Sequence, residues 1–498
     1  MTEAIGAALP KGSAPIDAEL LIAARQQLLS GADHTFGGFG GAPKFPQAPA
    51  LDFLLRSGAG VGNDDATAFV HATLDSMAAG GLRDHVGGGF SRYSVDRRWE
   101  IPHFEKMLYD NALLARLYLR SWQAGGPGHH REVAVSTLEY VLRDLRLPGG
   151  AFASAEDADS EGEEGLFYTW DLEEFRTVCG ADAPVGEALW GISARGNFEG
   201  RNHLRVVAGV DAVAAGLELE ADEVREAAAR CLDALFEARS RRVRPGLDDK
   251  VVVAWNGLMI RALAEAGAIL AETRFLDAAC AAADFVLSEA SMPDGRLHRT
   301  WAKGRAGPAG VLEDHASMAL ACFTLYQATG EYRWFAQANR LTRLVVEWFV
   351  VDGDLYATAH DVDDLIVRPT DQMDNPAPGG SSMAIEALWT LHLYTGESEL
   401  GDLGESAIRS ASLLAERAPS AVGHLLAVVS SLSDAREVAV VGPAAEALAH
   451  PVRSTLPHDV VLAVSEDGSE PIPLLADRHV EGSTLAYVCR SFVCERPV

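Results

Sequence analysis

The chain has 498 residues, 48% of them hydrophobic, and this length allows two or three domains or one large ring of repeated units. Its 42 basic and 71 acidic residues give a formal net charge of −29 at pH 7. Such a charge repels nucleic acids and anionic membrane surfaces, so we expect no nucleic-acid and no membrane partner.

The sequence shows few signs of secretion or of metal binding. No basic segment followed by an apolar one opens the chain, and we count no apolar run of about 18 residues. The six cysteines include no C-x-x-C pair, which leaves a zinc site or a disulfide framework with little support. Cys489 and Cys494 are near enough in sequence to pair, but we expect buried free thiols. These features predict a cytoplasmic protein.

In chain order, residues 1–16 form a proline-containing lead-in, and a first helix pattern follows over 17–29 with Asp17 as the expected N-cap. The segment HTFGGFGGAPKFPQAP contains too much glycine and proline for a helix interior. Two further helix patterns follow over 51–56 and 65–79.

The stretch 80–122 combines a glycine-rich loop with a high density of titratable and aromatic side chains. Pro102 suits a first helical turn, so we expect a helix mouth that carries His103, Glu105 and Lys106. Apolar residues at helical spacing continue this helix from Met107. The candidate site residues in this stretch are Asp84, His85, Arg92, Tyr93, Trp99, His103, Glu105, Lys106, Asp110 and Asn111.

Four segments repeat one pattern, in which a polar opening leads into an apolar helix that stops at a glycine. They begin at Asn111, Asn256, His315 and Ser382, and each is followed by a second helix pattern. Residues 170–235 leave room for one further unit with insertions. With the patterns before residue 80, the chain has about twelve helices.

Stacked helical hairpins can bury their apolar faces by closing into a double ring. We therefore predict an all-α protein with an (α/α)6 toroid over 17–432 and a small α/β appendage over 433–498. The inner helices of such a ring run in one direction, so their N-terminal ends meet at one rim. Polar clusters occupy this position in four units, at 103–106, 248–256, 313–315 and 374–382. Helix capping explains single residues there, whereas the joint pattern favours a shared site.

An acidic segment, SAEDADSEGEEGLFYTW, lies between two units. Asp157, Asp159 and Glu161 imitate the start of a calcium loop, but Tyr168 occupies the position that requires a glutamate. The alternatives are a solvated acidic loop, or a loop that brings Glu156, Asp157, Tyr168 and Trp170 to a polyhydroxylated ligand. We assign no metal and no cofactor.

Several long runs resemble a known family: GGFGGAPKFPQ, DHVGGGFSRYSVDRRWEIPHFEKMLYDNALLA, SAEDADSEGEEGLFYTW, GNFEGRNHL, DDKVVVAWNGLMI and AYVCRSFVCERPV. They are similar to the YyaL-like and spermatogenesis-associated thioredoxin-domain-containing proteins over nearly the whole chain. The resemblance implies a six-hairpin glycosidase-like toroid, related to N-acylglucosamine and cellobiose 2-epimerases. It also implies a thioredoxin-like domain that this chain lacks, which makes a thioredoxin-like protein a possible partner. Ala254, His315 and Ser381 depart from the family pattern.

Two classes of function remain open. The first is a carbohydrate-active enzyme, either an epimerase or isomerase that uses histidine and carboxylate groups or a hydrolase that uses two carboxylates. The second is a non-catalytic sugar- or partner-binding module. We favour the enzyme, because the five candidate catalytic residues supply more proton-transfer groups than capping requires. They are His85, His103, Glu105, Asp249 and His315.

The other candidates are expected to bind the sugar. They are Asp84, Arg92, Tyr93, Trp99, Lys106, Asp110, Asn111, Glu156, Asp157, Trp170, Lys250, Trp255, Asn256 and Asp314. We expect Tyr93, Trp99, Trp170 and Trp255 to border one cavity and to stack on the sugar ring. His103 and His315 open different inner helices, so they are expected to reach the ligand from two sides. The substrate and the oligomeric state stay undefined.

Overall fold

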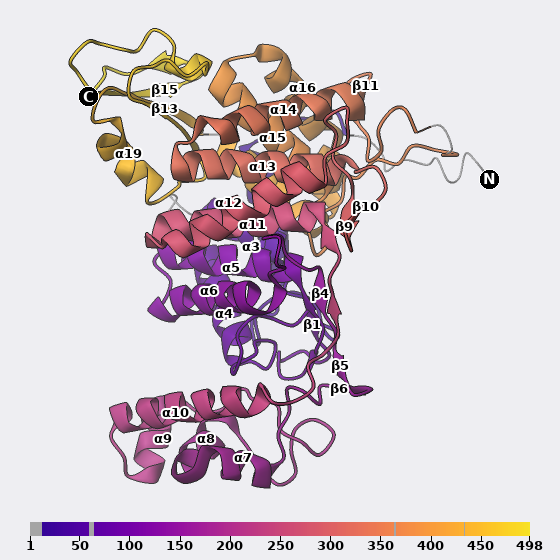
Figure 1. Ribbon diagram of the computed structural model, residues 1–498, viewed down its shortest axis with the longest axis vertical. Helices are drawn as coiled ribbons and strands as arrows, with labels where there is room; N and C mark the ends of the chain where they lie inside the picture. Colours follow the sequence, from indigo (N-terminus) through magenta and orange to yellow (C-terminus); the bar gives the residue numbers. More distant parts are fainter. Residues whose placement is uncertain (1–11, 59–63, 363–364, 433) are drawn as a thin grey trace.

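The structure is a computed structural model that describes residues 12–58, 64–362, 365–432 and 434–498 (Figure 1). Most of the predicted lead-in therefore lies outside the described residues. Asp17 is the N-cap of the first described helix and accepts a hydrogen bond from the N–H of Leu20, at 3.0 Å, as the sequence predicts.

Twelve helices of the described chain form a closed ring in two layers. The inner helices are α3 (Ala48–Gly58), α5 (Leu108–Gln123), α11 (Val253–Leu270), α13 (Leu312–Thr329), α15 (Gly380–Thr395) and α18 (Gly423–Leu432). The outer helices are α2 (Ala18–Ser30), α4 (Asp64–Ala79), α6 (Gly128–Tyr140), α12 (Thr273–Glu289), α14 (Tyr332–Phe349) and α16 (Ser398–Ser410). Each inner helix packs on the next, and α18 packs on α3, so the ring closes and the (α/α)6 prediction is confirmed.

Shorter helical segments connect the ring. They are η1 (Val141–Leu145) after α6, and α17 (Ser412–Arg417) and η3 (Pro419–Val422) between α16 and α18. Inner helices are enclosed on all sides, which explains why they carry apolar residues on every face. Among the described helices, α11 alone is long and apolar enough to span a membrane, and 72% of it is buried in the ring. This helix differs from our prediction that the chain has no apolar run of about 18 residues.

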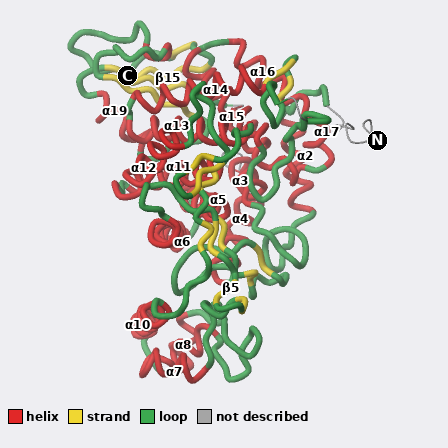
Figure 2. The backbone as a smooth tube through the Cα atoms, turned by 45° about the vertical axis from the view of Figure 1, so that its right-hand side comes forward, coloured by secondary structure: helices red, strands yellow, loops and turns green. Residues whose placement is uncertain are grey.

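Short strands and loops cover the rim at the N-terminal ends of the inner helices (Figure 2). The strands are β1 (Tyr93–Ser94), β2 (Pro102–His103), β3 (Lys106–Met107), β4 (Ala155–Glu156), β5 (Asp159–Ser160), β6 (Glu163–Glu164), β7 (Leu247–Asp248), β8 (Val251–Val252), β9 (Thr300–Ala302), β10 (Arg305–Ala306), β11 (Val350–Val351) and β12 (Asp354–Leu355). They pair as β1-β2, β3-β4-β7, β10-β9-β8, β5-β6 and β11-β12.

The helix that we predicted to start at Pro102 starts at Leu108 instead. Pro102 and His103 form strand β2, which pairs with Ser94 and Tyr93. Lys106 and Met107 form β3 and pair with Glu156 and Ala155. Strand pairing satisfies the backbone groups of this segment and overrides the preference of proline for a first helical turn.

Residues 172–239 form a separate helical bundle at one end of the molecule (Figure 1). It contains α7 (Leu172–Cys179), η2 (Gly180–Asp182), α8 (Ala183–Trp190), α9 (Val210–Leu217) and α10 (Ala221–Arg239). Its own buried cluster includes Trp170, Phe175, Trp190 and Leu235. We call it the side bundle. The prediction that this segment supplies a further unit of the ring is wrong, because its apolar faces close on one another.

The C-terminal part is a small α/β unit. It contains β13 (Arg436–Val441), α19 (Ala445–Arg453), β14 (Val460–Ser465), η4 (Pro473–Leu475), β15 (Leu485–Arg490) and β16 (Val493–Cys494). The strand order is β14-β13-β15-β16, with β13 parallel to β14 and the other pairs antiparallel. Cys489 and Cys494 are cross-strand partners and form a disulfide, so our expectation of free thiols is wrong for this pair. The other four cysteines are free.

Candidate active site at the ring rim

Six side chains gather at the N-terminal end of α5, and we call them the rim cluster. They are Arg92, Tyr93, His103, Glu105, Tyr109 and Asp110. The pairing of β1 with β2 places Tyr93 opposite His103. The backbone N–H of Arg92 donates to the carbonyl of Glu105 at 2.8 Å. Short-strand pairing thus brings together residues from a loop and from the approach to a helix.

An imidazole lies between two carboxylates in this cluster. Nδ1 of His103 is 2.8 Å from Oε1 of Glu164, on β6, and its Nε2 is 3.7 Å from Oε2 of Glu105. Arg92 Nη1 donates to Oε2 of Glu105 at 3.2 Å. The side chains of His103 and Glu105 are 28% and 27% exposed. A ligand can therefore reach an imidazole that Glu164 holds in a fixed orientation.

Asp110 adds a carboxyl group behind this exposed layer. It stands in the first turn of α5, is 5% exposed, and its Oδ2 has no hydrogen-bond partner. Burial raises the pKa of Asp110 well above its usual range, although Arg92 opposes the shift. Burial also raises the pKa of the neighbouring Tyr109 hydroxyl, which stays protonated. A carboxyl whose protonated form is favoured in this way is a candidate proton donor.

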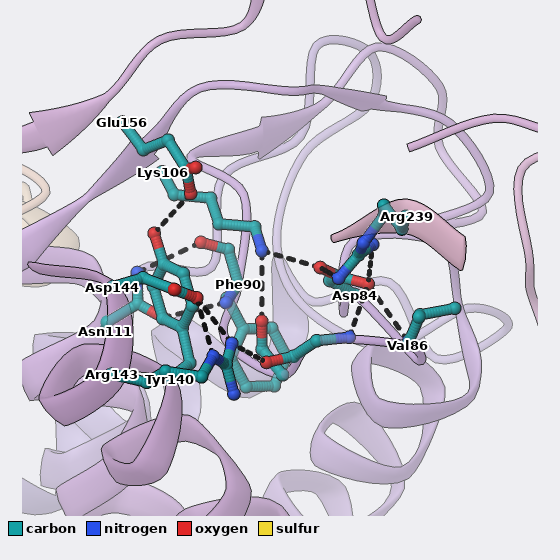
Figure 3. A network of polar contacts seen from close by, with 12 residues as sticks. Asp84, Val86, Phe90, Lys106, Asn111, Tyr140, Arg143, Asp144, Glu156 and Arg239 are labelled. Atoms are coloured by element: carbon teal, nitrogen blue, oxygen red, sulfur yellow. Dashed lines mark hydrogen bonds and ion pairs between the residues drawn. The ribbon is translucent and has the colours of Figure 1, made fainter. Parts of the chain in front are cut away.

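A second group of predicted residues forms a buried ion network beside the rim cluster (Figure 3). Asp84 accepts from Lys106 Nζ at 2.8 Å and from both Nη atoms of Arg239 at 2.9 Å. Burial opposes its charge, yet Arg239 and Lys106 hold the pKa of Asp84 well below its usual range. Glu156 accepts from the Tyr140 hydroxyl at 3.0 Å and from Arg244 at 2.7 Å. These buried groups are paired with protein, so we assign them to positioning and not to ligand contact.

The four aromatic residues expected around one cavity lie in different places. Trp99 is buried in the core of the ring, where its Nε1 donates to Phe36, and Trp170 is buried in the core of the side bundle. Tyr93 lies between Phe45 and His103, at 4.8 and 5.0 Å between ring centroids. Trp255 meets the edge of Tyr109 at 5.0 Å. The prediction that all four border one cavity is wrong, because Trp99 and Trp170 are fully buried in separate cores, while Tyr93 and Trp255 are half-buried.

Three residues that we predicted to mark a shared site, Asn111, Asn256 and His315, instead have the same structural role. Each side chain joins the N–H of a neighbouring loop to a backbone carbonyl near the start of its own helix. Asn111 Oδ1 accepts from Phe90 N–H and its Nδ2 donates to Met107 O, and Asn256 makes the same bonds with Phe152 and Val252.

His315 occupies the same place on α13. Its Nε2 accepts from the N–H of Leu297, so Nδ1 carries the proton that it donates to Val311 O. Burial lowers the pKa of His315 to about 4. Both ring nitrogens are occupied, so the catalytic assignment of His315 is wrong.

The other candidates lie apart from the rim cluster. His85 Nε2 donates to Gly80 O at 2.9 Å, and burial, followed by Arg83, lowers its pKa to about 4. Asp314 accepts from two backbone N–H groups and from Arg299, while burial raises its pKa to about 7. Asp249 and Asp157 are exposed, and Lys250 pairs with Asp248. Capping, solvation or local pairing accounts for each of them.

Sequence comparison identifies relatives over most of the chain. No family model matches. Spermatogenesis-associated protein 20 of Homo sapiens is 33% identical over 526 residues, which covers 95% of this chain and 67% of that protein. The protein of the same name from Rattus norvegicus is 34% identical over 526 residues, with the same coverage. The chain belongs to the spermatogenesis-associated protein 20 family.

Solved structures show the fold of this family member. The crystal structure of D-mannose isomerase superposes with a TM-score of 0.51 at 10% identity, covering 79% of this chain and 86% of that one. A glycoside hydrolase family 76 mannosidase from Bacteroides thetaiotaomicron has a TM-score of 0.45 at 9% identity, covering 80% and 98%. The ring of helical hairpins thus has the fold of D-mannose isomerase.

Sequence reasoning missed a second set of charged residues, on the inward faces of the inner helices. Glu265 accepts from Arg116 Nη2 at 2.7 Å and lies 3.2 Å from Arg120, and Glu386 pairs with Arg261 and with His424. Charges at i and i+4 within otherwise apolar helices were the available signal. The cavities among these residues measure about 80 and 20 Å³. A larger cavity of about 780 Å³ lies at the C-terminal ends of α5 and α18.

Proposed function

We propose that this family member is a carbohydrate-active enzyme that transfers protons at the rim cluster, in an epimerase- or isomerase-like reaction on a small sugar. The observation that carries the proposal is the combination of Asp110, a buried carboxyl with a raised pKa, with a solvent-reachable His103 held by Glu164. The fold shared with D-mannose isomerase supports the class of reaction.

The contacts suggest a role for each group. Glu164 accepts the Nδ1–H of His103, which leaves the lone pair of Nε2 free to remove the proton from the carbon next to a sugar carbonyl. The C–H electron pair then forms a carbon–carbon double bond, and Asp110 gives its proton to the carbonyl oxygen. Arg92 holds the oxygens of the resulting enediol. Return of a proton to the opposite face of the same carbon gives the epimer, and return to the neighbouring carbon gives the ketose. In both cases an enediol hydroxyl gives its proton back to Asp110 as the carbonyl forms again.

The test is proton exchange in deuterated water. Wild-type protein is incubated with a panel of aldoses, and NMR follows the C2 proton. We expect C2 deuteration, and a fall in its rate of about 10²–10⁴-fold in His103→Gln and in Asp110→Asn. Glu347→Gln, which changes an exposed glutamate on α14, is the matched control and keeps the wild-type rate.

Other outcomes contradict the proposal in distinguishable ways. Cleavage of glycosides that depends on Glu105 and Asp110, without C2 exchange, favours the hydrolase. Sugar or partner binding with neither reaction favours a non-catalytic module. Exchange that survives in both rim variants excludes the rim cluster as the reaction site.

A further inference from the structure

Three histidines and an aspartate meet where α4 packs beside α5 and the first turn of α6, and we call them the histidine cluster. Its members are His71, Asp75, His129 and His130. Nε2 of His129 and Nε2 of His130 lie 2.7 and 3.0 Å from the same Oδ1 of Asp75. The donor atoms of these three residues all lie within 4.8 Å of one another. None of the four takes part in the rim cluster.

These spacings suit one metal ion. Zinc binds imidazole nitrogen at about 2.0 Å, so two ligands of a tetrahedral site stand roughly 3.3 Å apart. Small side-chain rotations bring the three donor atoms to such separations. Imidazole and carboxylate together favour zinc and similar transition metals, whereas calcium and magnesium take oxygen ligands.

The surroundings of His130 resemble those of a metal ligand. Its ring is fully buried, and Nδ1 lies 2.9 Å from Oγ of Ser121, on α5. This contact fixes the ring so that Nε2 points at Asp75. A hydrogen bond on the distal nitrogen is the usual way in which proteins orient a ligating histidine.

His71 supplies an independent observation. It stands one helical turn before Asp75 on α4, and its ring centroid is 5.8 Å from that of His130. Its Nε2 is buried without a hydrogen-bond partner. Buried polar atoms are nearly always paired, so this nitrogen lacks a partner that a bound ion would supply.

A metal ion can also reach the cluster from solvent. The side chains of His129 and Asp75 are 48% and 45% exposed. The positive end of the α6 dipole opposes a cation, and the carboxylate of Asp75 offsets it. We propose that Asp75, His129 and His130 bind a divalent transition-metal ion of the zinc type, with His71 beside them.

The experiment titrates Co²⁺ into untagged, chelator-treated protein and follows visible absorption, with Zn²⁺ as competitor. We expect one ion per chain, the intense bands of a tetrahedral site, and their loss when Zn²⁺ is added. His129→Ala removes an exposed ligand without disturbing the core. It should weaken binding by more than about 100-fold, beyond the loss typical of an outer-shell residue.

His450→Ala is the matched control, because His450 is an exposed histidine on α19, and it should bind like wild type. Absence of a one-to-one signal, or equal binding by His129→Ala and wild type, overturns the proposal. Unchanged binding by Asp75→Ala contradicts the three-ligand set.

Discussion

Asp110 is held in a state that favours its protonated form, and this makes its contribution to stability depend on pH. The folded protein binds this proton more tightly than the unfolded chain, whose aspartates titrate near about pH 3.9. The contribution of Asp110 to stability is therefore fully present in acid. It is lost as the pH rises through the raised pKa of the folded state.

Asp110→Asn should consequently stabilise the protein at alkaline pH while it impairs catalysis. At pH 8 we expect the free energy of unfolding to exceed that of wild type by roughly 1–3 kcal/mol, the cost of an uncompensated buried group, with a smaller difference at pH 5. Urea denaturation at both pH values measures this. A variant less stable than wild type at pH 8 would show that Asp110 has a partner in its charged form.

Substitutions of His315 test its structural role, which is to bond the N–H of Leu297 and the carbonyl of Val311. This role replaces the catalytic one that we predicted from the sequence. His315→Ala removes the bond to the carbonyl of Val311 and leaves the buried N–H of Leu297 unpaired, so it should lower the free energy of unfolding by about 1–3 kcal/mol. His315→Asn can restore both bonds as Asn256 makes them, and should recover more than half of the loss. Chemical denaturation compares the two. Equal destabilisation by both substitutions would contradict the shared role.

These residues show what sequence spacing could and could not predict about the site. Strand pairing in a loop already rich in polar groups brought Arg92, Tyr93, His103, Glu105 and Asp110 together. Sequence position does not fix the direction of a side chain. Trp99 and Trp170 have polar neighbours in the sequence, and for this reason we did not predict that they are core residues. Glu164 was missed because its contact with His103 spans 61 residues.

At the scale of elements, the ion network around Asp84 joins three parts of the chain. It connects the glycine-rich loop to β3 through Lys106 and to α10 of the side bundle through Arg239 (Figure 3). The side bundle has its own core, so this network is a principal polar attachment between it and the rim.

Asp84→Asn should loosen this attachment, because it leaves two buried cations without their shared counter-charge. We expect a loss of about 3–5 kcal/mol and faster amide exchange in α10 by mass spectrometry. Asp182→Asn is the control, since it removes a bidentate pair with the more exposed Arg230 in the same bundle and should cost at most about 1 kcal/mol. Similar effects of the two substitutions would refute the attachment role.

Helices were predictable because long apolar periods recur at helical spacing, and the hairpins that begin near residues 111, 256, 315 and 382 are present. The rim strands were not, since most contain two residues and show no alternation. The side bundle has the same helical periodicity as a ring unit. Periodicity shows that a face is buried and does not show which partner buries it.

The whole molecule depends on closure of the ring where α18 meets α3. A Cβ atom on Gly423 would lie 2.6 Å from the backbone nitrogen of Ala50 and 2.7 Å from the carbonyl carbon of Pro49. Both are backbone atoms, so relief requires the two helices to separate. This contact between distant parts of the chain could not be read from hairpin counts.

Gly423→Ala should therefore destabilise the entire ring, by about 1–3 kcal/mol, as overpacked cores do. Gly216→Ala is the matched control: Gly216 is also helical, in α9, and has open space around its Cβ position. The control should be neutral or stabilising by up to about 1 kcal/mol. Calorimetry measures both, and a neutral Gly423→Ala would contradict closure through tight α18–α3 packing.

The central claim is that a sugar binds at the rim cluster. The most direct measurement is a crystal structure of the protein soaked with a mixture of monosaccharides. We predict sugar density within hydrogen-bonding distance of Arg92 and Glu105, with a ring carbon beside Nε2 of His103 and an oxygen facing Asp110. Density confined to the cavity of about 780 Å³ at the opposite ends of α5 and α18, with the rim cluster unoccupied, would contradict the account.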